Sequence, residues 1–564
     1  MNHLVTEFEK NAGFNEYPRP QLVRDSFLNL NGKWQLELNG QNYDITVPYP
    51  PESRISGVFR NITKKDKMRY SRKFTLPDGF KKDRVLLHFG GVDTVCEVFV
   101  NGRPVGKNEG GYLPFCFDIT DALEDGENEL SLDVRDRPDK NYPYGKQRGK
   151  RGGMWYTDVS GIWQTVWLES VCDNYIKSIR MTPTTDSVMI TVLGGCEKKE
   201  IEFDGKTHVF YGESHLLRVE NAENWTPDNP KLYQFTLTSG ADRVQSYFAL
   251  RTVSVCGDKI LLNGKPYFFH GLLDQGYYSD GIFTPASPEG YKKDILTAKK
   301  CGFNMLRKHI KLEPDLFYYY CDKYGMAVFQ DFINNGGYNF IVDTALPNLF
   351  LKRGVTHFAS KKRRKMFFET SEGIMDALYN HPSVLYYTVF NEGWGQFDAD
   401  GCYTRFKKYD PTRVYDTTSG WFKTRLSDVE SEHIYFKRVR LKKKARPTVL
   451  SEFGGYSCCV EGHRFNTKGN LGYSKTTSDT KLFERDIEKL YRRDVVENIK
   501  NGLVASVMTQ LSDVEDETNG IMTYDRAVLK VDPLKMQALA KEIFDGFEKY
   551  QLAQEKTDGA CNKR

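Results

Sequence analysis

The chain has 564 residues, a length that predicts about three or four domains. Hydrophobic residues make up 39% of it and aromatic residues 13%, which is enough for several packed cores. Its 80 basic and 75 acidic residues leave a formal net charge of +5, so the composition gives no reason to expect a nucleic acid or another polyanion as partner.

The eleven cysteines are scattered and form no C-x-x-C pair, a pattern that indicates free thiols in a reducing compartment. The first residues lack a basic stretch followed by an apolar one, so no signal peptide is expected. No run of about 18 apolar residues occurs, so no membrane span is expected either. The sequence therefore predicts a cytoplasmic protein.

The first half of the chain has the pattern of β-structure. From Leu30 to about Val171, short runs with period-two alternation are separated by turns such as Asn31-Gly32 and Asn101-Gly102, which predicts a β-sandwich. A polar, glycine-rich insert at 139–158 interrupts it, and inserts of this length are usually functional or disordered. Residues 173 to about 252 predict a second, immunoglobulin-like β-sandwich.

From about Ser254 the pattern changes to strands that alternate with helices. Eight predicted strands over roughly 300 residues are typical of a (β/α)₈ barrel. The strands are expected at Tyr267–Gly271, Asn304–Arg307, Ala327–Gln330, Val384–Asn391, Val414–Thr418, His433–Phe436, Thr448–Glu452 and Ala505–Leu511. Helices are expected, among other places, at Tyr291–Cys301, Pro314–Tyr324, Lys365–Tyr379, Lys481–Asn501 and Pro533–Phe547.

Two of these strands each end in a glutamate. Glu392 closes the fourth predicted strand in YTVFNEGWG, and Glu452 closes the seventh in TVLSEFGG. In a barrel of this type the active site forms at the carboxyl ends of the strands. Paired carboxylates in that position suit acid/base and nucleophilic work on a glycosidic bond.

Five motifs in the expected order carry a resemblance to a known family. They are Ser160–Glu169 (SGIWQTVWLE), Trp225–Tyr233 (WTPDNPKLY), Leu250–Thr252, Asn380–Glu392 and Ser451–Gly454. With them, nearly the whole chain resembles glycoside hydrolase family 2, which includes β-galactosidases, β-glucuronidases and β-mannosidases. The resemblance implies a jelly-roll sugar-binding domain at 1–172, an immunoglobulin-like sandwich at 173–253 and a catalytic (β/α)₈ barrel at 254–552, followed by a polar tail at 553–564.

The resemblance also implies roles at the site. Glu392 would be the general acid/base and Glu452 the nucleophile of a retaining mechanism, and Asn391 would bind the sugar 2-hydroxyl. Further substrate-binding candidates lie at or near strand ends, where a structural role in the core is the alternative. These candidates are Arg307, His309, Asp331, Trp394, Trp421, Tyr435 and Gln510.

Departures from the family pattern leave the sugar open. Gln275 stands where many members carry a histidine, and Thr509-Gln510-Leu511 stands where several glucuronidases carry a tryptophan motif. Asn466 and Lys468 imitate the Asn-x-Lys pair with which glucuronidases hold a carboxylate, but they precede the eighth strand, whereas in those enzymes the motif follows it. The acidic block Asp513–Asp525 has no compelling metal-ligand spacing, and we expect no metal or cofactor.

The sequence thus predicts a retaining exo-β-glycosidase that acts on a small β-glycoside or an oligosaccharide, with β-galactosidase-like specificity slightly favoured. A β-glucuronidase or another β-hexuronidase is the first alternative. A non-catalytic carbohydrate-binding protein on the same fold is the second. No nucleic-acid or membrane partner is expected, and a homo-oligomer is compatible with the sequence.

Overall fold

The computed structural model describes residues 4–136, 139–345, 357–466, 472–473 and 475–561. The chain begins with an extended arm that contains the short 3₁₀-helix η1 (Glu7–Asn11). A β-sandwich follows, with a six-stranded sheet of order β3-β2-β4-β10-β7-β8 and a four-stranded sheet of order β1-β12-β5-β9, in addition to the pair β11-β6. Its strands are β1 (Leu28–Asn29), β2 (Gly32–Leu38), β3 (Gln41–Val47), β4 (Met68–Thr75), β5 (Arg84–Phe89), β6 (Val92–Asp93), β7 (Val95–Val100), β8 (Arg103–Glu109), β9 (Phe115–Asp118), β10 (Glu127–Arg135), β11 (Gly161–Ile162) and β12 (Val166–Val171).

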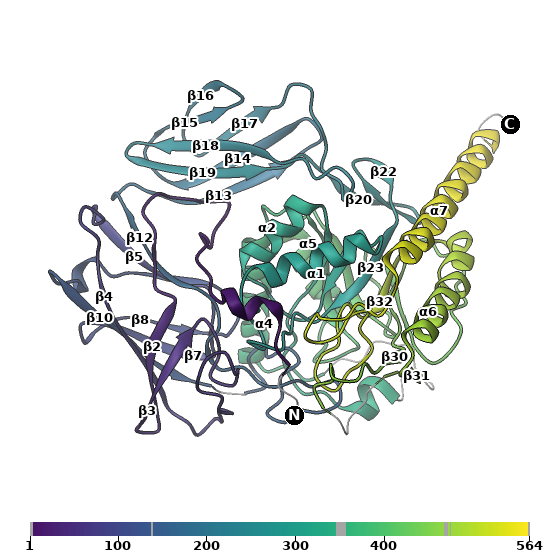
Figure 1. The fold of residues 1–564 in the computed structure, drawn as a ribbon. Helices are drawn as coiled ribbons and strands as arrows, with labels where there is room; N and C mark the ends of the chain where they lie inside the picture. Colours follow the sequence, from purple (N-terminus) through teal and green to yellow (C-terminus); the bar gives the residue numbers. More distant parts are fainter. Residues whose placement is uncertain (1–3, 137–138, 346–356, 467–471, 474, 562–564) are drawn as a thin grey trace.

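A second, smaller sandwich packs a three-stranded sheet of order β13-β14-β17 on a four-stranded sheet of order β16-β15-β18-β19. Figure 1 shows it at the top of the molecule, above both the first sandwich and the barrel. Its strands are β13 (Ile176–Pro183), β14 (Ser187–Gly194), β15 (Lys198–Phe203), β16 (Lys206–Tyr211), β17 (Ser214–Arg218), β18 (Tyr233–Ser239) and β19 (Asp242–Phe248). A small sheet then leads into the barrel, with β20 (Val253–Cys256), β21 (Lys259–Leu262) and β22 (Lys265–Pro266).

The barrel is an eight-stranded parallel sheet of order β27-β26-β25-β24-β23-β32-β29-β28. Its end strands, β27 and β28, lie next to each other, so the barrel is nearly closed. The strands are β23 (Phe269–Asp274), β24 (Met305–Lys308), β25 (Ala327–Asp331), β26 (Val384–Asn391), β27 (Val414–Ser419), β28 (Glu430–Ile434), β29 (Thr448–Gly454) and β32 (Leu503–Thr509). The helices around it are α1 (Glu289–Lys300), α2 (Asp315–Tyr324), α4 (Lys361–Leu378), α5 (Ala399–Tyr409), α6 (Thr480–Asp494) and α7 (Pro533–Cys561), with the 3₁₀-helix η4 at Val496–Asn501.

The predicted fold class of a jelly-roll sandwich, a second β-domain and a (β/α)₈ barrel is confirmed. Strand β26 has the predicted bounds, whereas β28 begins three residues before the predicted His433–Phe436 strand. Helix α7 runs past its predicted end at Phe547 to Cys561, so the expected polar tail is largely helical backbone. The reason is that the stretch after Phe547 consists mostly of good helix formers such as Glu, Lys, Leu, Gln and Ala.

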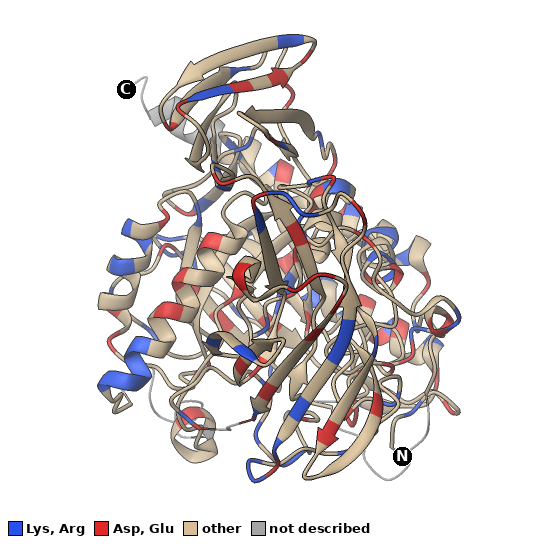
Figure 2. Ribbon diagram, turned by 90° about the vertical axis from the view of Figure 1, so that its left-hand side faces the viewer, with Lys and Arg blue, Asp and Glu red and all other residues tan. Residues whose placement is uncertain are grey.

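The charged residues are spread over all three parts of the chain. Figure 2 shows lysine and arginine alternating with aspartate and glutamate along the strands and helices that face the viewer. The ten described cysteines are all free. Within the described ranges, we find no helix with the length and apolarity required to cross a membrane.

Candidate active site

Glu392 lies directly after β26, a strand whose eight residues are all buried. Its backbone has φ 52°, in the left-handed region that non-glycine residues rarely adopt, and its N–H donates to the Ser419 carbonyl at 2.9 Å. This turn takes the chain out of the barrel wall and presents the carboxyl to the space above the strands. The side chain is 14% exposed, which makes it accessible to a ligand.

Glu452 belongs to β29, and its carboxylate is held by two donors. Oε1 accepts from Arg307 Nη1 at 3.0 Å, and Oε2 accepts from the Tyr435 hydroxyl. Burial acts to raise the pKa of Glu452. The charge effects of His433 and Arg307, together with the Tyr435 hydrogen bond, outweigh burial and lower that pKa to about 2. The site therefore holds Glu452 ionised.

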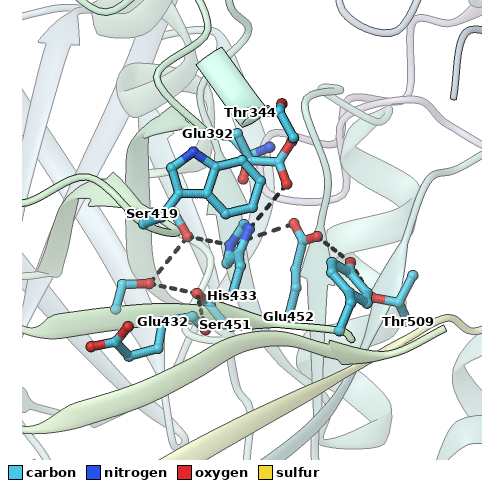
Figure 3. Close-up of polar contacts among 12 residues, drawn as sticks. Thr344, Glu392, Ser419, Glu432, His433, Ser451, Glu452 and Thr509 are labelled. Atoms are coloured by element: carbon cyan, nitrogen blue, oxygen red, sulfur yellow. Dashed lines mark hydrogen bonds and ion pairs between the residues drawn. The ribbon is translucent and has the colours of Figure 1, made fainter. Parts of the chain in front are cut away.

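A histidine that the sequence did not single out lies between the two glutamates (Figure 3). His433 Nδ1 is 3.2 Å from Glu392 Oε1, and its Nε2 is 3.6 Å from Glu452 Oε1 and 3.2 Å from Ser419 Oγ. The imidazole is fully buried. The predicted strand began at His433, so the residue was available to sequence analysis, but no motif marked it.

One ligand atom from each of Glu392, His433 and Glu452 lies within 4.8 Å of the others, which is a spacing that a metal ion could bridge. However, Arg307 Nη1 lies 3.4 Å from His433 Nε2 and 3.0 Å from Glu452 Oε1. A guanidinium in that place repels a cation and already supplies positive charge to the carboxylate. The donor set therefore does not fit a resident metal.

Arg307 also organises the floor of the site below the glutamates. Its Nε donates to Asp331 Oδ1 at 3.0 Å and its Nη2 donates to Asn391 Oδ1 at 2.9 Å. Because the oxygen of Asn391 accepts this bond, its amide nitrogen remains to face a ligand. Asp331 Oδ2 lies 2.6 Å from His309 Nδ1, and burial lowers the pKa of His309, so its Nε2 is free to accept a hydrogen bond.

These residues surround a cavity of about 890 Å³ at the carboxyl ends of the barrel strands. Its wall includes six residues predicted for the site: Asn391, Glu392, Glu452, His309, Trp421 and Tyr435. Arg307 and Asp331 lie beneath the wall and act on residues that line it.

Besides Arg307 and Asp331, two further predicted site residues do not line the cavity. Trp394 is buried behind Trp155, with ring centroids 4.9 Å apart, and donates to the Tyr144 hydroxyl at 3.1 Å. Gln510 is fully buried and donates to Glu517 and Asn519 at 2.8 and 2.7 Å. Lys468 of the Asn-x-Lys pair lies outside the described residues.

The insert at 139–158 of the first sandwich reaches over the barrel and contributes cavity residues that sequence patterns did not identify: Lys146, Arg148, Gly152, Gly153, Met154 and Trp155. It is anchored where the Thr157 N–H donates to Glu515 Oε1 of the barrel at 2.9 Å. The long polar insert was the available signal, because a segment of this length is commonly functional, but its target was not deducible from spacing.

The charge of the cavity wall is asymmetric. Among the described residues that line it, the only carboxylates are Glu392 and Glu452, whereas Lys146, Arg148 and Lys437 are cationic. Lys146 is only 8% exposed, and its ammonium group has no hydrogen-bond or ion-pair partner among the described residues. It lies near His309, because its charge adds to the effect of burial in lowering the pKa of that histidine.

Comparisons with known proteins agree with this architecture. A family model described as "Glycosyl hydrolases family 2, TIM barrel domain" matches residues 253–529, and one described as "Glycosyl hydrolase 2 galactose-binding domain-like" matches residues 56–163. A β-galactosidase of Thermoanaerobacter pseudethanolicus is 28% identical over 336 residues, covering 54% of this chain and 44% of the relative. One of Aeromonas hydrophila is 25% identical over 475 residues, covering 74% of this chain and 43% of the relative. The chain therefore spans less than half the length of these curated relatives.

Solved structures share the fold over almost the entire chain. A β-D-glucuronidase of Dictyoglomus thermophilum superposes with a TM-score of 0.74 at 19% identity, covering 94% of this chain and 99% of the other. A β-galacturonidase of Eisenbergiella tayi bound to galacturonate gives a TM-score of 0.68 at 19% identity, covering 93% and 99%. At this identity the likeness establishes the fold alone.

Proposed function

Because the chain belongs to glycosyl hydrolase family 2, we propose that it is a retaining exo-β-glycosidase that removes a terminal β-linked sugar. The observation that carries this proposal is the spacing of the two carboxyl groups, which have oxygens within 4.8 Å of each other. Retaining glycosidases hold their carboxyls about 5–5.5 Å apart, whereas inverting ones need about 6.5–9.5 Å to admit a water molecule.

In the first step Glu452, held ionised, attacks the anomeric carbon while Glu392 gives its proton to the glycosidic oxygen. The bond from the anomeric carbon to that oxygen breaks, and the aglycone leaves as an alcohol. A glycosyl ester on Glu452 remains. In the second step Glu392, now ionised, takes a proton from water as the water oxygen attacks the anomeric carbon and releases Glu452. The sugar leaves with the configuration it had.

Four nearby residues support the proposal. Asn391 presents its amide nitrogen to the sugar 2-hydroxyl, because its oxygen is held by Arg307. His433 fixes one oxygen of Glu392 and leaves the other to face the substrate. On the opposite side, Gln275 and His309 are buried and suit the hydroxyls of a single terminal sugar, which favours exo action.

Hydrolysis of para-nitrophenyl β-glycosides tests the proposal. The accepted sugar should be released first as the β-anomer by NMR, and an α-anomer would refute retention. Glu452→Gln should lower kcat/KM by about 10³-fold or more. Glu392→Gln should lower kcat/KM by about 10²–10⁴-fold for substrates with poor leaving groups, because these need a proton to depart. The loss should be smaller for substrates with activated leaving groups. Activity that survives Glu452→Gln unchanged would overturn the assignment.

The curated relatives favour a β-galactoside as substrate. A β-hexuronide is the second candidate, and Lys146 is the specific observation in its favour. A nearly buried ammonium that makes no ion pair would be stabilised by a substrate carboxylate, and the one carboxyl that its charge acts on, Glu517, is buried outside the lining of the cavity. The solved neighbours named as a glucuronidase and a galacturonidase point the same way.

Parallel assays on a β-galactoside and on the matching β-galacturonide separate the two candidates. If the substrate is a uronide, Lys146→Met should lower kcat/KM for it by about 10–100-fold, the value of a charge-assisted hydrogen bond. Lys437→Met, which removes an exposed cation from the rim of the same cavity, is the matched control and should have little effect. If the native protein prefers the β-galactoside and Lys146→Met leaves kcat/KM unchanged, the uronide is excluded as the substrate.

We further propose a division of the chain into a jelly-roll domain at 1–172, an immunoglobulin-like domain at 173–253 and a catalytic barrel from 254. Separate hydrophobic cores of the two sandwiches support it, one within Leu30–Leu168 and one chiefly within Ile176–Leu250. A cytoplasmic location is proposed on the free thiols.

A further inference from the structure

The cavity has two chemically different sides, and the order of the barrel strands indicates which side takes the leaving group and which takes the sugar ring. Glu392 ends β26, which lies between β25 and β27. Strand β32 is four places away from β26 around the barrel and is therefore opposite. Because the acid protonates the glycosidic oxygen, the leaving group must lie on its side, whereas the sugar ring extends toward β23, β24 and β32.

Toward Glu392 the cavity has an aromatic wall, made by the loops that follow β25, β27 and β28 and by the insert; of these strands, β25 and β27 flank β26. The wall consists of Trp155, Tyr338, Phe340, Trp421 and Phe436. Phe340 is 62% exposed and Phe436 is 82% exposed. Large apolar side chains that stand open to solvent at the mouth of a cavity mark a binding surface, because they gain the hydrophobic free energy only when a ligand covers them.

The polar groups on this side are mostly engaged with one another. The Tyr338 and Thr344 hydroxyls are 2.7 Å apart, and Trp421 Nε1 donates to the Asp343 carbonyl at 2.7 Å. Asn339 Oδ1 accepts from the Ile341 N–H at 3.0 Å. A second sugar needs partners for several hydroxyls, and this wall offers few: the exposed exceptions are Lys437 and Arg148, whose guanidinium lies over the Trp155 ring. A flat apolar group needs none.

We propose that this aromatic wall is the aglycone subsite and that it takes a planar apolar leaving group, such as a phenolic or polycyclic aglycone. The inference rests on the proposed glycosidase function and goes beyond it by naming the class of aglycone. A pyranose as leaving group is the competing outcome.

The test compares leaving groups of similar acidity but different apolar area. Phenyl and biphenyl-4-yl β-glycosides of the accepted sugar differ by one ring, so their ratio of kcat/KM reports contacts rather than leaving-group chemistry. We expect the biphenyl-4-yl substrate to be preferred by about tenfold or more. A ratio near one, or a KM as low for the corresponding disaccharide as for the biphenyl-4-yl substrate, would overturn the proposal.

The double variant Phe340→Ser/Phe436→Ser should lower kcat/KM more for the biphenyl-4-yl substrate than for the phenyl one, and reduce the preference about fivefold or more. Tyr211→Ser is the matched control, because Tyr211 is 68% exposed on β16 of the second sandwich, and it should leave the ratio unchanged. An unchanged ratio in the double variant would assign the preference to another surface.

Failure of the function and failure of the inference give different results. If no β-glycoside is hydrolysed, the proposed function fails, and the subsite is then tested by calorimetric binding of the biphenyl-4-yl 1-thio-β-glycoside. Tight binding that the double variant weakens supports the aromatic subsite without catalysis. Hydrolysis of the panel with no effect of the aglycone rejects the inference and leaves the function standing.

Discussion

The ionised state of Glu452 is set by three kinds of neighbour: a buried guanidinium, a buried imidazole and a phenol. Of these, the Tyr435 hydroxyl donates directly to Oε2 and adds no charge, so it can be removed without a change in net charge. Because the bond stabilises only the ionised form of the carboxyl, the phenol lowers the pKa of Glu452. Its removal must raise that pKa.

Tyr435→Phe should therefore lower kcat/KM by about 10–100-fold, the worth of a charge-assisted hydrogen bond. It should also move the acidic limb of the pH profile to higher pH, since Glu452 then becomes protonated earlier as the pH falls. Tyr473→Phe is the control, because Tyr473 packs 4.8 Å from the Tyr435 ring but donates to Glu517 instead. An acidic limb that stays in place in Tyr435→Phe would contradict the assignment.

His433 acts through Glu392, and we expect it to be a positioning residue. His433→Gln keeps one N–H donor but loses the ring that spans both carboxyls. We expect kcat to fall by about 10–100-fold on alkyl and phenyl glycosides, whose departure needs the acid. The fall should be smaller on a 2,4-dinitrophenyl glycoside, which leaves without a proton. Equal losses on both substrates would indicate that His433 acts through Glu452, whose pKa it helps to lower, or through the fold, and not through Glu392.

At the scale of the element, apolar patterning located the strands as long as their inward residues were apolar. It gave the bounds of β26 because all eight of its residues are buried and most are hydrophobic. It misplaced the start of β28 because the residues that this strand buries are Ser431 and His433. When the inward-facing residues of a barrel strand belong to the active site, they are polar, and the sequence of the strand then resembles that of a loop.

Side-chain direction explains the remaining differences at the site. Both glutamates and Asn391 were predicted because motif and strand end coincide. Trp394 was not predictable in the same way, because the turn at Gly393 (φ 69°) sends it away from the cavity. Lys146 and Trp155 come from an insert some 240 residues before Glu392, and only the packing of one domain on the other brings them to the cavity.

The loop after β26 depends on a glycine that no other residue can replace without movement. Gly395 has φ 64°, and a Cβ there would lie 1.9 Å from the Asn335 carbonyl oxygen. Gly395→Ala should therefore destabilise the protein by about 1–3 kcal/mol and, by displacing the loop that carries Glu392, lower kcat. Differential scanning calorimetry and single-turnover kinetics measure the two effects.

Gly205→Ala separates strain from displacement. Gly205 has a similar φ of 71°, but a Cβ there meets nothing within 4 Å. This control should lower the free energy of unfolding by about 1 kcal/mol, because of backbone strain, and leave kcat unchanged. If Gly395→Ala retained full kcat, the position of Glu392 would not depend on this contact.

At the scale of the whole molecule, a buried ion network joins the amino-terminal arm to both sandwiches. Arg24 of the arm donates to Glu169 of β12 at 3.0 Å and to Asp242 of β19 at 2.8 and 3.0 Å. The three side chains are at most 3% exposed. Burial acts to raise the pKa of Glu169, but Arg19 and the other cations outweigh it and lower that pKa to about 2.

Arg24→Met should destabilise the protein at neutral pH by about 3–5 kcal/mol, because it leaves buried carboxylates without their partner. The depressed pKa of Glu169 means that its ion pairs stabilise the folded state above the unfolded value of about 4.3 and lose this effect as the pH falls toward 2. The difference in free energy of unfolding between the native protein and the variant should therefore shrink from pH 7 to pH 3.

Arg243→Met is the matched control, because its pair with Glu202 is more than half exposed, and it should lower the free energy of unfolding by less than about 1 kcal/mol. Urea unfolding followed by tryptophan fluorescence measures both, and a loss in Arg24→Met that is small or independent of pH would show that the network does not hold the two sandwiches together.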